Sequence, residues 1–500
     1  MSDGAILVPC FVVIPMAGAF VNSLLGKKIK GLPDLLGSLA PLVLLGLSLL
    51  AVKTVHSGAA LVYPVGSWNP PVGIAMVLDG LTSFMLVTVN MVAFAIAVYA
   101  RDYMERYTSK EMFYTLFLLM LVGMNGVIVA GDLFNLFVFV EISAVASYAL
   151  VAFGTERHEL EAAFKYAMMG TVGSLFILLG IALLYSVTST LNMADMGLVL
   201  AEQRDGNLIL MVSVLFLMGF GLKGALVPFH AWLPDAHPSA PAPISAMLSG
   251  VLIKSLGIYA LSRIFFNVIG LTPMMSSILM FLGTLSMVVG ALLAMGQRDL
   301  KRLLAYSSIS QVGYVFLGIG LGTPLGVLGG LLHLFNHAVF KSLLFLNAGA
   351  LEYATGTRDL HMMGGLRKKM PVTNMTSFVA SMSIAGMPPF SGFWSKLIII
   401  IAAVQAGHPG YALWAVMVSV LTLALFMKFM KFAFTGELRQ DGLKVQEVPG
   451  FMRVAMVGLA LICLAGGTLL IPGLREIFLN QAAAIFAEGS NYANVILRMN

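Results

Sequence analysis

A single glutamate interrupts a long apolar run of the sequence. Glu141 lies within Leu133–Leu150, a stretch with the length and composition of a transmembrane helix. An ionised carboxylate in hydrocarbon costs at least a few kcal/mol, so it needs a partner, a water-filled path or a proton. Asp132 marks the membrane edge nine residues earlier, which places Glu141 roughly 13 Å deep, near the bilayer middle. We expect Asp132 itself to cap a helix rather than to carry protons.

Four lysines of the opposite charge lie in or beside other apolar segments: Lys223, Lys254, Lys341 and Lys396. Burial and a nearby carboxylate act in opposite directions on the proton affinity of a lysine, so a Glu141–Lys223 pair whose separation changes would be a proton switch. Lys254 is about ten residues into its apolar segment, again near the bilayer middle. The alternative for Glu141 is a structural ion pair between packed helices, and that for Lys223 is a static lysine that only stabilises the broken helix. For Lys254 and Lys396 the alternative is a lysine that extends to the membrane interface.

His333, His337 and Lys341 are spaced at i, i+4 and i+8, which stacks them on one helix face about 6 Å apart per step. Neutral imidazole can both donate and accept a hydrogen bond, so this histidine–lysine row can relay protons. A metal site is the rival interpretation, but the sequence offers no nearby cysteine or carboxylate ligand. His230 and His237 lie in an interruption between apolar segments and either line a water path or lie at the interface.

The composition indicates a membrane protein. Of 500 residues, 59% are hydrophobic and only 10% are charged, with a mean hydropathy of +0.94, a balance that a water-soluble fold cannot carry. The net charge of +6 does not indicate nucleic-acid binding, because the bases gather in short loops between apolar runs. Cys10 and Cys463 lie inside hydrophobic segments and have no metal-site or disulfide pattern. Without a nucleotide loop, flavin fingerprint or haem motif, we expect no cofactor and no redox chemistry in this chain alone.

Apolar windows of about 20 residues predict an all-α polytopic fold of about fourteen transmembrane helices. The expected spans are 5–25, 34–55, 78–100, 112–131, 133–153, 162–186, 207–227, 243–265, 272–295, 302–322, 324–354, 372–405, 411–434 and 453–472. The seventh and twelfth contain Pro228 and Pro388, which must kink or break a helix. Each break has Pro-Phe, a nearby tryptophan and a lysine within about two turns.

An odd offset between two similar spans reverses their orientation, so the breaks predict an inverted repeat of spans 4–8 and 9–13. The chain then divides into residues 1–111, with three helices and an extramembrane hairpin in the loop 56–77, a first repeat at 112–265, a second repeat at 266–434, and a last helix with a tail at 435–500. We expect the tail from residue 475 to form an amphipathic surface helix.

Lysine and arginine follow the odd-numbered spans, so those loops are expected to be cytoplasmic and both termini to lie outside. The clusters are Lys27, Lys28 and Lys30; Arg101, Arg106 and Lys110; Arg157; Arg298, Lys301 and Arg302; Arg367, Lys368 and Lys369; and Lys431, Arg439, Lys444 and Arg453. The loops after even-numbered spans hold only scattered bases, of which Arg263 is one.

Several motifs closely resemble the antiporter-like family shared by Mrp-type multi-subunit cation/proton antiporters, respiratory complex I and membrane-bound hydrogenases. They are Gly131–Glu141, Gly224–Asp235, Pro241–Ala246, the histidine–lysine row and Pro389–Lys396. The resemblance implies fourteen helices, two inverted five-helix repeats and a central row of charges. It also implies that Glu141 and Lys223 form the paired proton switch, that Lys254 and the histidine–lysine row form the connecting proton relay, and that Lys396 is the terminal lysine. The Gly131–Glu141 motif looks most like the Mrp D-type protein and its hydrogenase relatives, whereas Lys396 departs from the complex I member that has glutamate there.

The resulting hypothesis is a proton- and cation-translocating subunit of a Mrp-type Na⁺/H⁺ antiporter in the cell's plasma membrane. Its partners would be other membrane subunits, protons and Na⁺. One alternative is the proton-pumping subunit of a membrane-bound hydrogenase or complex I-like oxidoreductase. Another is a structural membrane subunit whose charges are unused.

Overall fold

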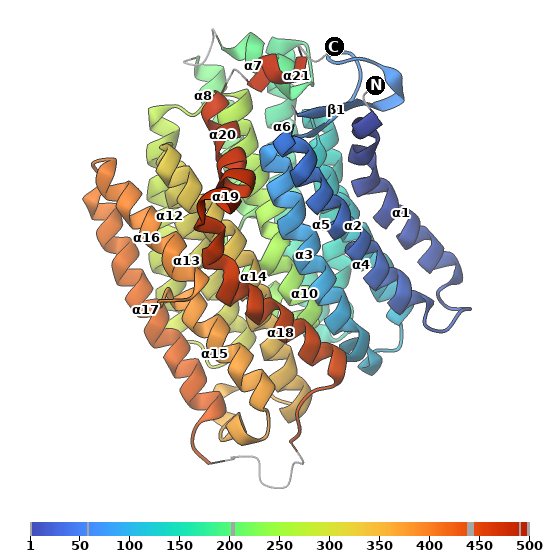
Figure 1. The fold of residues 1–500 in the computed structure, drawn as a ribbon, viewed down its shortest axis with the longest axis vertical. Helices are drawn as coiled ribbons and strands as arrows, with labels where there is room; N and C mark the ends of the chain where they lie inside the picture. Colours follow the sequence, from blue (N-terminus) through green and yellow to red (C-terminus); the bar gives the residue numbers. More distant parts are fainter. Residues whose placement is uncertain (1–2, 58–59, 202–205, 438–444, 490–491, 498–500) are drawn as a thin grey trace.

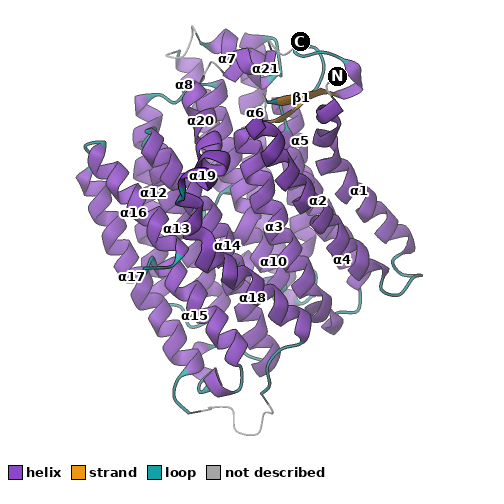
Figure 2. Ribbon diagram, in the orientation of Figure 1, coloured by secondary structure: helices purple, strands orange, loops and turns teal. Residues whose placement is uncertain are grey.

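The chain folds into a bundle of long helices with one small hairpin at an end (Figures 1 and 2). The computed structural model describes residues 3–57, 60–201, 206–437, 445–489 and 492–497. The α-helices are α1 (Leu7–Leu25), α2 (Leu32–Ser57), α3 (Gly80–Tyr103), α4 (Lys110–Val129), α5 (Leu133–Val151), α6 (Arg157–Thr188), α7 (Met193–Leu200), α8 (Asn207–Lys223), α9 (Leu233–Ser239), α10 (Ala242–Met247), α11 (Ala260–Arg263), α12 (Pro273–Met295), α13 (Leu300–Gly320), α14 (Pro324–Thr355), α15 (Pro371–Ala385), α16 (Ser391–Gln405), α17 (Pro409–Phe434), α18 (Gly450–Ala465), α19 (Pro472–Leu474), α20 (Gln481–Glu488) and α21 (Tyr492–Leu497). Both termini lie at the same end of the bundle (Figure 1).

Among the described residues, twelve helical segments are long and apolar enough to cross a membrane. The all-α polytopic fold is therefore confirmed. The expected seventh and twelfth spans are not among the twelve, because each is divided into shorter helices: α8 ends at Lys223 and α9 begins at Leu233, while α15 ends at Ala385 and α16 begins at Ser391. Both expected breaks are thus present. The total of fourteen crossings, the inverted repeat and the four-part division remain predictions.

Polar caps begin many of the helices, as unsatisfied backbone N–H groups require in a membrane protein. The Asp132 carboxylate accepts a hydrogen bond of 2.8 Å from the backbone N–H of Asn135, so it caps α5 as expected. Asp79 caps α3 in the same way through the N–H of Thr82. The caps fix where each span begins, and hence how deep its polar residues lie.

The interior of the bundle is formed by three segments that are almost wholly surrounded by protein. These are the segment from Ala242 to Val268, in which α10 and α11 alternate with π-helical turns, and the helices α13 and α14; their most apolar windows are 100%, 94% and 94% buried. The outer helices α1, α17 and α18 have only a third of theirs buried. Lys254 and the histidine–lysine row therefore belong to the most enclosed part of the fold.

The loop 56–77 contains the expected hairpin. Strands β1 (Leu61–Pro64) and β2 (Ala75–Leu78) pair antiparallel, with Leu61 opposite Leu78, and they lie at the end of the bundle that carries the termini (Figure 2). The described part of the tail, 475–489 and 492–497, is largely helical. The buried face of α20, which includes Ala482 and Phe486, packs on α3 and α14.

Candidate functional site

Glu141 and Lys223 meet between α5 and α8. The Nζ of Lys223 lies 3.4 Å from Oε1 of Glu141. Lys223 is the last residue of α8, so its ammonium lies at a helix end where backbone carbonyls lack intrahelical partners. The lysine side chain is 3% exposed and that of the glutamate is 32% exposed. The lysine is therefore enclosed by the fold, whereas the glutamate side chain is partly exposed.

Two hydroxyl groups complete this pair. Ser174 on α6 donates a hydrogen bond to the Glu141 carboxylate, and the hydroxyl of Tyr148 lies 3.5 Å from the Lys223 ammonium. Tyr148 packs edge-on against Tyr166, whose hydroxyl lies 3.0 Å from that of a buried serine on α5. These hydroxyls gave no signal in the sequence, because single serines and tyrosines are common in apolar helices.

The first break is held by side chains that replace lost backbone hydrogen bonds. The Trp232 indole donates to the carbonyl of Leu222 at 2.9 Å, and the Ser286 hydroxyl accepts from the N–H of Val227 at 3.0 Å. Broken backbone at membrane depth is tolerated only when its polar groups are satisfied in this way. The tryptophan common to both break motifs therefore has a structural role at the first of them.

Lys254 lies in a π-helical turn, Lys254–Tyr259, and is completely buried. Its ammonium donates to the backbone carbonyl of Ser249. A Cβ on Gly257 would collide with Gly224, so only glycine lets this turn approach the first break so closely. The close approach brings the segment that carries Lys254 against the residue that follows Lys223.

Serines connect Lys254 to the histidine–lysine row. The Ser249 hydroxyl lies 2.7 Å from that of Ser308 on α13. The neighbouring Ser307 accepts from the ammonium of Lys341 at 2.5 Å, and the carbonyl of Leu304 accepts from it at 2.8 Å. A nearly continuous set of polar contacts therefore runs from Lys254 across α13 to α14. The adjacent serines Ser307 and Ser308 gave only a weak sequence signal for this link, because α13 carries several other polar residues.

The histidine–lysine row lies on one face of α14, as its spacing predicts. The rings of His333 and His337 are parallel, with centroids 6.4 Å apart, and all three side chains are completely buried. The Nδ1 of His333 lies 2.9 Å from the Ser395 hydroxyl, while neither ring nitrogen of His337 has a hydrogen-bond partner among the described residues. Within the described part of the chain, no group of three or more His, Cys, Asp or Glu side chains is arranged to hold a metal ion.

Lys396 follows the second break and is held by the helix that precedes it. Its ammonium donates to the carbonyl of Ile384 at 2.8 Å and lies 4.7 Å from the centre of the Tyr314 ring. That ring lies 5.3 Å from the ring of His333. Lys396 forms no ion pair with a described carboxylate, so its surroundings differ from those of Lys223. The row on α14 and Lys396 are nonetheless brought together.

The two histidines of the first interruption are placed differently. His237 is completely buried, with Trp232 and Phe345 against its ring. His230 is partly exposed.

A polar cavity of about 480 Å³ adjoins Ala240 and Lys301. Lys301 is buried and pairs with Glu352 at 2.9 Å, so this residue is not a solvated loop base.

Arg263 is also not a loop base. The pattern of bases places it among those after an even-numbered span, but its guanidinium is buried and bonds the Asp79 carboxylate at 2.6 Å. The ring of Tyr492 from α21 lies 5.0 Å from the guanidinium. The pair therefore ties the start of α3, the end of α11 and the tail together, and it gives no information on topology.

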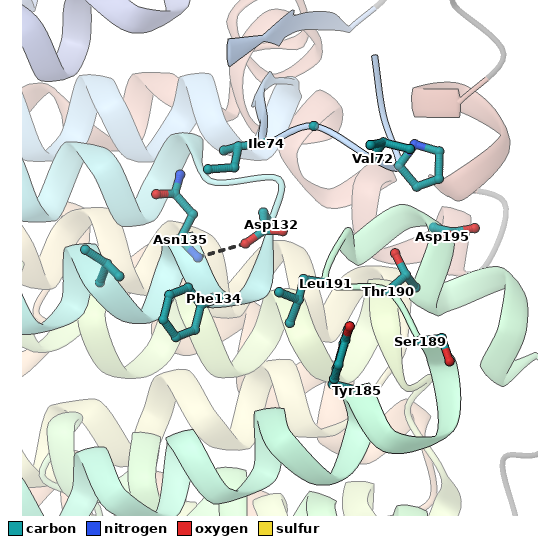
Figure 3. Close-up of a pocket in the computed structure, with 13 residues that line it drawn as sticks. Val72, Ile74, Asp132, Phe134, Asn135, Tyr185, Ser189, Thr190, Leu191 and Asp195 are labelled. Atoms are coloured by element: carbon teal, nitrogen blue, oxygen red, sulfur yellow. Dashed lines mark hydrogen bonds between the residues drawn. The ribbon is translucent and has the colours of Figure 1, made fainter. Parts of the chain in front are cut away.

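Two hollows lie along α5. One, of about 510 Å³, is lined by Asp132, Asp195 and Asn135, with the carboxylates on separate sides of it (Figure 3). The other, of about 490 Å³, is lined by Glu141 and apolar side chains. Val138 lines both. The hollow that Glu141 lines is thus largely apolar, and Val138 lies between it and the hollow at the start of α5.

Comparisons with known proteins cover most of the chain. The sequence model described as "NADH:quinone oxidoreductase/Mrp antiporter, TM" covers residues 130–422, and one described as "NADH-Ubiquinone oxidoreductase (complex I), chain 5 N-terminus" covers residues 64–114. The N-type subunit of NADH-quinone oxidoreductase from Desulforudis audaxviator is 39% identical over 79% of each chain. The D-type subunit of the Na(+)/H(+) antiporter from Alkalihalophilus pseudofirmus is 36% identical over 85% of this chain and 86% of the relative.

Solved structures agree. A chain of the Mrp complex from Dietzia superposes with a TM-score of 0.92 at 28% identity, over 99% of this chain and 100% of the other. A chain of an archaeal membrane-bound sulfane sulfur reductase, a respiratory membrane complex, superposes with a TM-score of 0.90 at 30% identity over the same shares. The buried charges at two broken helices, the fold and the sequence all agree: this chain belongs to the NADH:quinone oxidoreductase/Mrp antiporter family of multi-pass membrane subunits.

Proposed function

We propose that this chain is the proton- and cation-translocating D-type subunit of a Mrp-type Na⁺/H⁺ antiporter. The observation that carries the proposal is the Glu141–Lys223 pair, in which a partly exposed glutamate lies against a buried lysine at a helix break. The similarity to the D-type antiporter protein of Alkalihalophilus over most of both chains supports the multi-subunit setting. The chain would lie in the plasma membrane beside other membrane subunits, with both termini outside.

In this proposal the ion pair is the switch. While Glu141 holds Lys223 at 3.4 Å, the charged lysine is favoured. When the pair separates, the buried ammonium loses its compensating charge, and transfer of its proton towards Lys254 becomes favourable. Lys223 ends α8, and the next residue, Gly224, packs directly against Gly257 in the segment that carries Lys254. A backbone movement at the break would therefore shift that segment too, which supports such a transfer.

The remaining route would pass through the polar contacts of the interior. From Lys254 the proton would move by way of the serines of α13 to Lys341, along the histidine–lysine row, and through His333 towards Lys396. Neutral histidines suit this role because each can accept a proton at one nitrogen and release one at the other. His230 and His237 would line the water path beside the first break.

The test is ion-driven proton movement by the reconstituted complex. Purified complex in proteoliposomes should alkalinise or acidify the lumen when a Na⁺ gradient is applied, with no electron donor or acceptor present. A matched preparation with an inert Lys53→Gln substitution, at an exposed base of α2, should behave as the parent does. Absence of Na⁺-dependent proton movement in an intact complex would contradict the antiporter assignment.

A second candidate rests on the respiratory relatives. The identity of 39% with an NADH-quinone oxidoreductase subunit and the superposition on a respiratory reductase favour a redox-driven proton pump. Here the same residues would move protons, but the driving reaction would occur in partner subunits. Co-purification with iron–sulfur or flavin subunits, and proton movement only on addition of a quinone and a reductant, would favour this candidate. Co-purification with small membrane subunits alone would favour the antiporter.

A further inference from the structure

A groove between α15 and α17 combines apolar walls with three bases. The α15–α17 groove has a volume of about 860 Å³ and is lined by Met375, Phe378 and Met427 together with Arg367, Lys428 and Lys431. Each of the three apolar side chains is more than 40% exposed. Apolar exposure is ordinary on a membrane protein, but a hollow of this size with bases at one end is not explained by contact with bulk lipid chains alone.

The groove is polar at one end and apolar along its length. On α17, Ala424 and Met427 precede Lys428 and Lys431 at steps of three and four residues, so all four follow one helix face. Arg367 precedes α15, whereas Phe378 lies half-way along it. The bases therefore gather where the helices leave the membrane, and the apolar residues lie further in.

The three bases have no acidic partner among the described residues. The Lys428 ammonium donates to the carbonyls of Met295 and Gln297 at 2.8 and 3.1 Å, which uses two of its three N–H donors. Those contacts hold the ammonium at the groove and leave one donor free. A groove with positive charge at one end and apolar walls along its length is complementary to an anion that carries an apolar chain.

We propose that the α15–α17 groove binds one anionic phospholipid of the bilayer. The phosphate is held by Arg367, Lys428 and Lys431, and an acyl chain lies along Met375, Phe378 and Met427. The polarity gradient matches that of a lipid with its headgroup at the membrane surface. The groove contains no residue of the proposed proton route, so this inference does not depend on the proposed function.

The test is lipid retention by the intact purified complex. Complex stripped in detergent is titrated with dioleoyl phosphatidylglycerol or dioleoyl phosphatidylcholine in mixed micelles, and bound lipid is counted by native mass spectrometry. The parent should retain one more phosphatidylglycerol than a triple Arg367→Gln, Lys428→Gln, Lys431→Gln variant. At about a five-fold loss of affinity per base, the triple variant should bind that lipid about 100-fold more weakly.

Two controls separate charge from shape. Removing three other bases with Lys27→Gln, Lys28→Gln and Lys30→Gln, in the loop after α1, should leave the count unchanged. Ala424→Trp fills the groove and keeps every charge, so it should remove the same lipid; it also keeps the proposal testable if the triple variant fails to assemble.

Three results would overturn the proposal. They are equal retention of the two lipids at this site, displacement of the lipid by glycerol phosphate alone, which would make it a free-anion site, and capture of a neighbouring subunit by a photo-crosslinker placed at Met427. Loss of phosphatidylglycerol in both Ala424→Trp and the triple variant, with the loop control unchanged, would support it.

Discussion

Replacement of His337 by alanine should slow proton transfer without disrupting assembly. In the parent, the ring centroids of His333 and His337 are 6.4 Å apart, a gap that one water molecule can bridge with two hydrogen bonds of about 2.8 Å. Without His337, His333 and Lys341 are eight residues apart, which is about 12 Å along the helix. The step from His337 to Lys341 is of similar length along the helix and needs about one water as well. About three waters in series are needed in the variant, one more than the two of the parent row.

The cost of the extra water sets the size of the effect. Immobilising an ordered water costs up to about 2 kcal/mol, so the one extra water lowers the rate by up to about 30-fold. We expect turnover of the reconstituted complex to fall at least about ten-fold within that bound. His337→Gln should restore little, because an amide forms hydrogen bonds but does not exchange protons near neutral pH.

A packing control is available on the same helix. Leu334 is buried on α14 and does not belong to the row, so Leu334→Ala creates a cavity without removing a proton carrier. Its cost, about 2–5 kcal/mol in stability, should appear in thermal inactivation but not in turnover at low temperature. If His337→Ala and His337→Gln both transport at the parental rate, the row is packing and the proton route runs elsewhere.

Other predictions follow from the same structure. Asp79→Ala leaves buried Arg263 unpaired, so the complex should lose about 3–5 kcal/mol of stability in denaturant titration. The double variant Asp79→Asn, Arg263→Met removes both charges and should recover most of that stability. Similar losses in the two variants would contradict a dominant role for the unpaired charge. Tags at either terminus should react with impermeant reagents from outside intact cells, and a cysteine at Lys369 should not. The reverse labelling pattern would overturn the expected topology.

The sequence predicts the features in which a residue is energetically unfavourable in apolar surroundings unless a particular structure forms around it. Glu141 and Lys223 could be paired in advance because isolated opposite charges in hydrocarbon need each other, and both breaks were visible because proline cannot continue a helix. The cap at Asp132 followed from its position just before an apolar run. In each case one residue imposes a local constraint that few structures can satisfy.

The features it missed depend on distant partners. Lys301 and Arg263 were predicted to be loop bases, because a count of Lys and Arg between apolar segments treats each of them as solvated. Their acidic partners, Glu352 and Asp79, come from other parts of the chain. The serines that join Lys254 to Lys341 gave little signal, because a hydroxyl can bond to its own helix and is tolerated in apolar segments. Such partners become visible only when the packing of α13 against its neighbours is known.

The central claim is that the Glu141–Lys223 pair is the switch of proton-coupled transport. The most direct measurement is Na⁺-coupled proton movement by assembled complexes carrying Glu141→Ala or Lys223→Ala, beside the parent, in the same proteoliposomes. Either substitution should abolish coupled transport while the complex still assembles, because each leaves the other charge without its partner. Parental rates of transport in either assembled variant would contradict it.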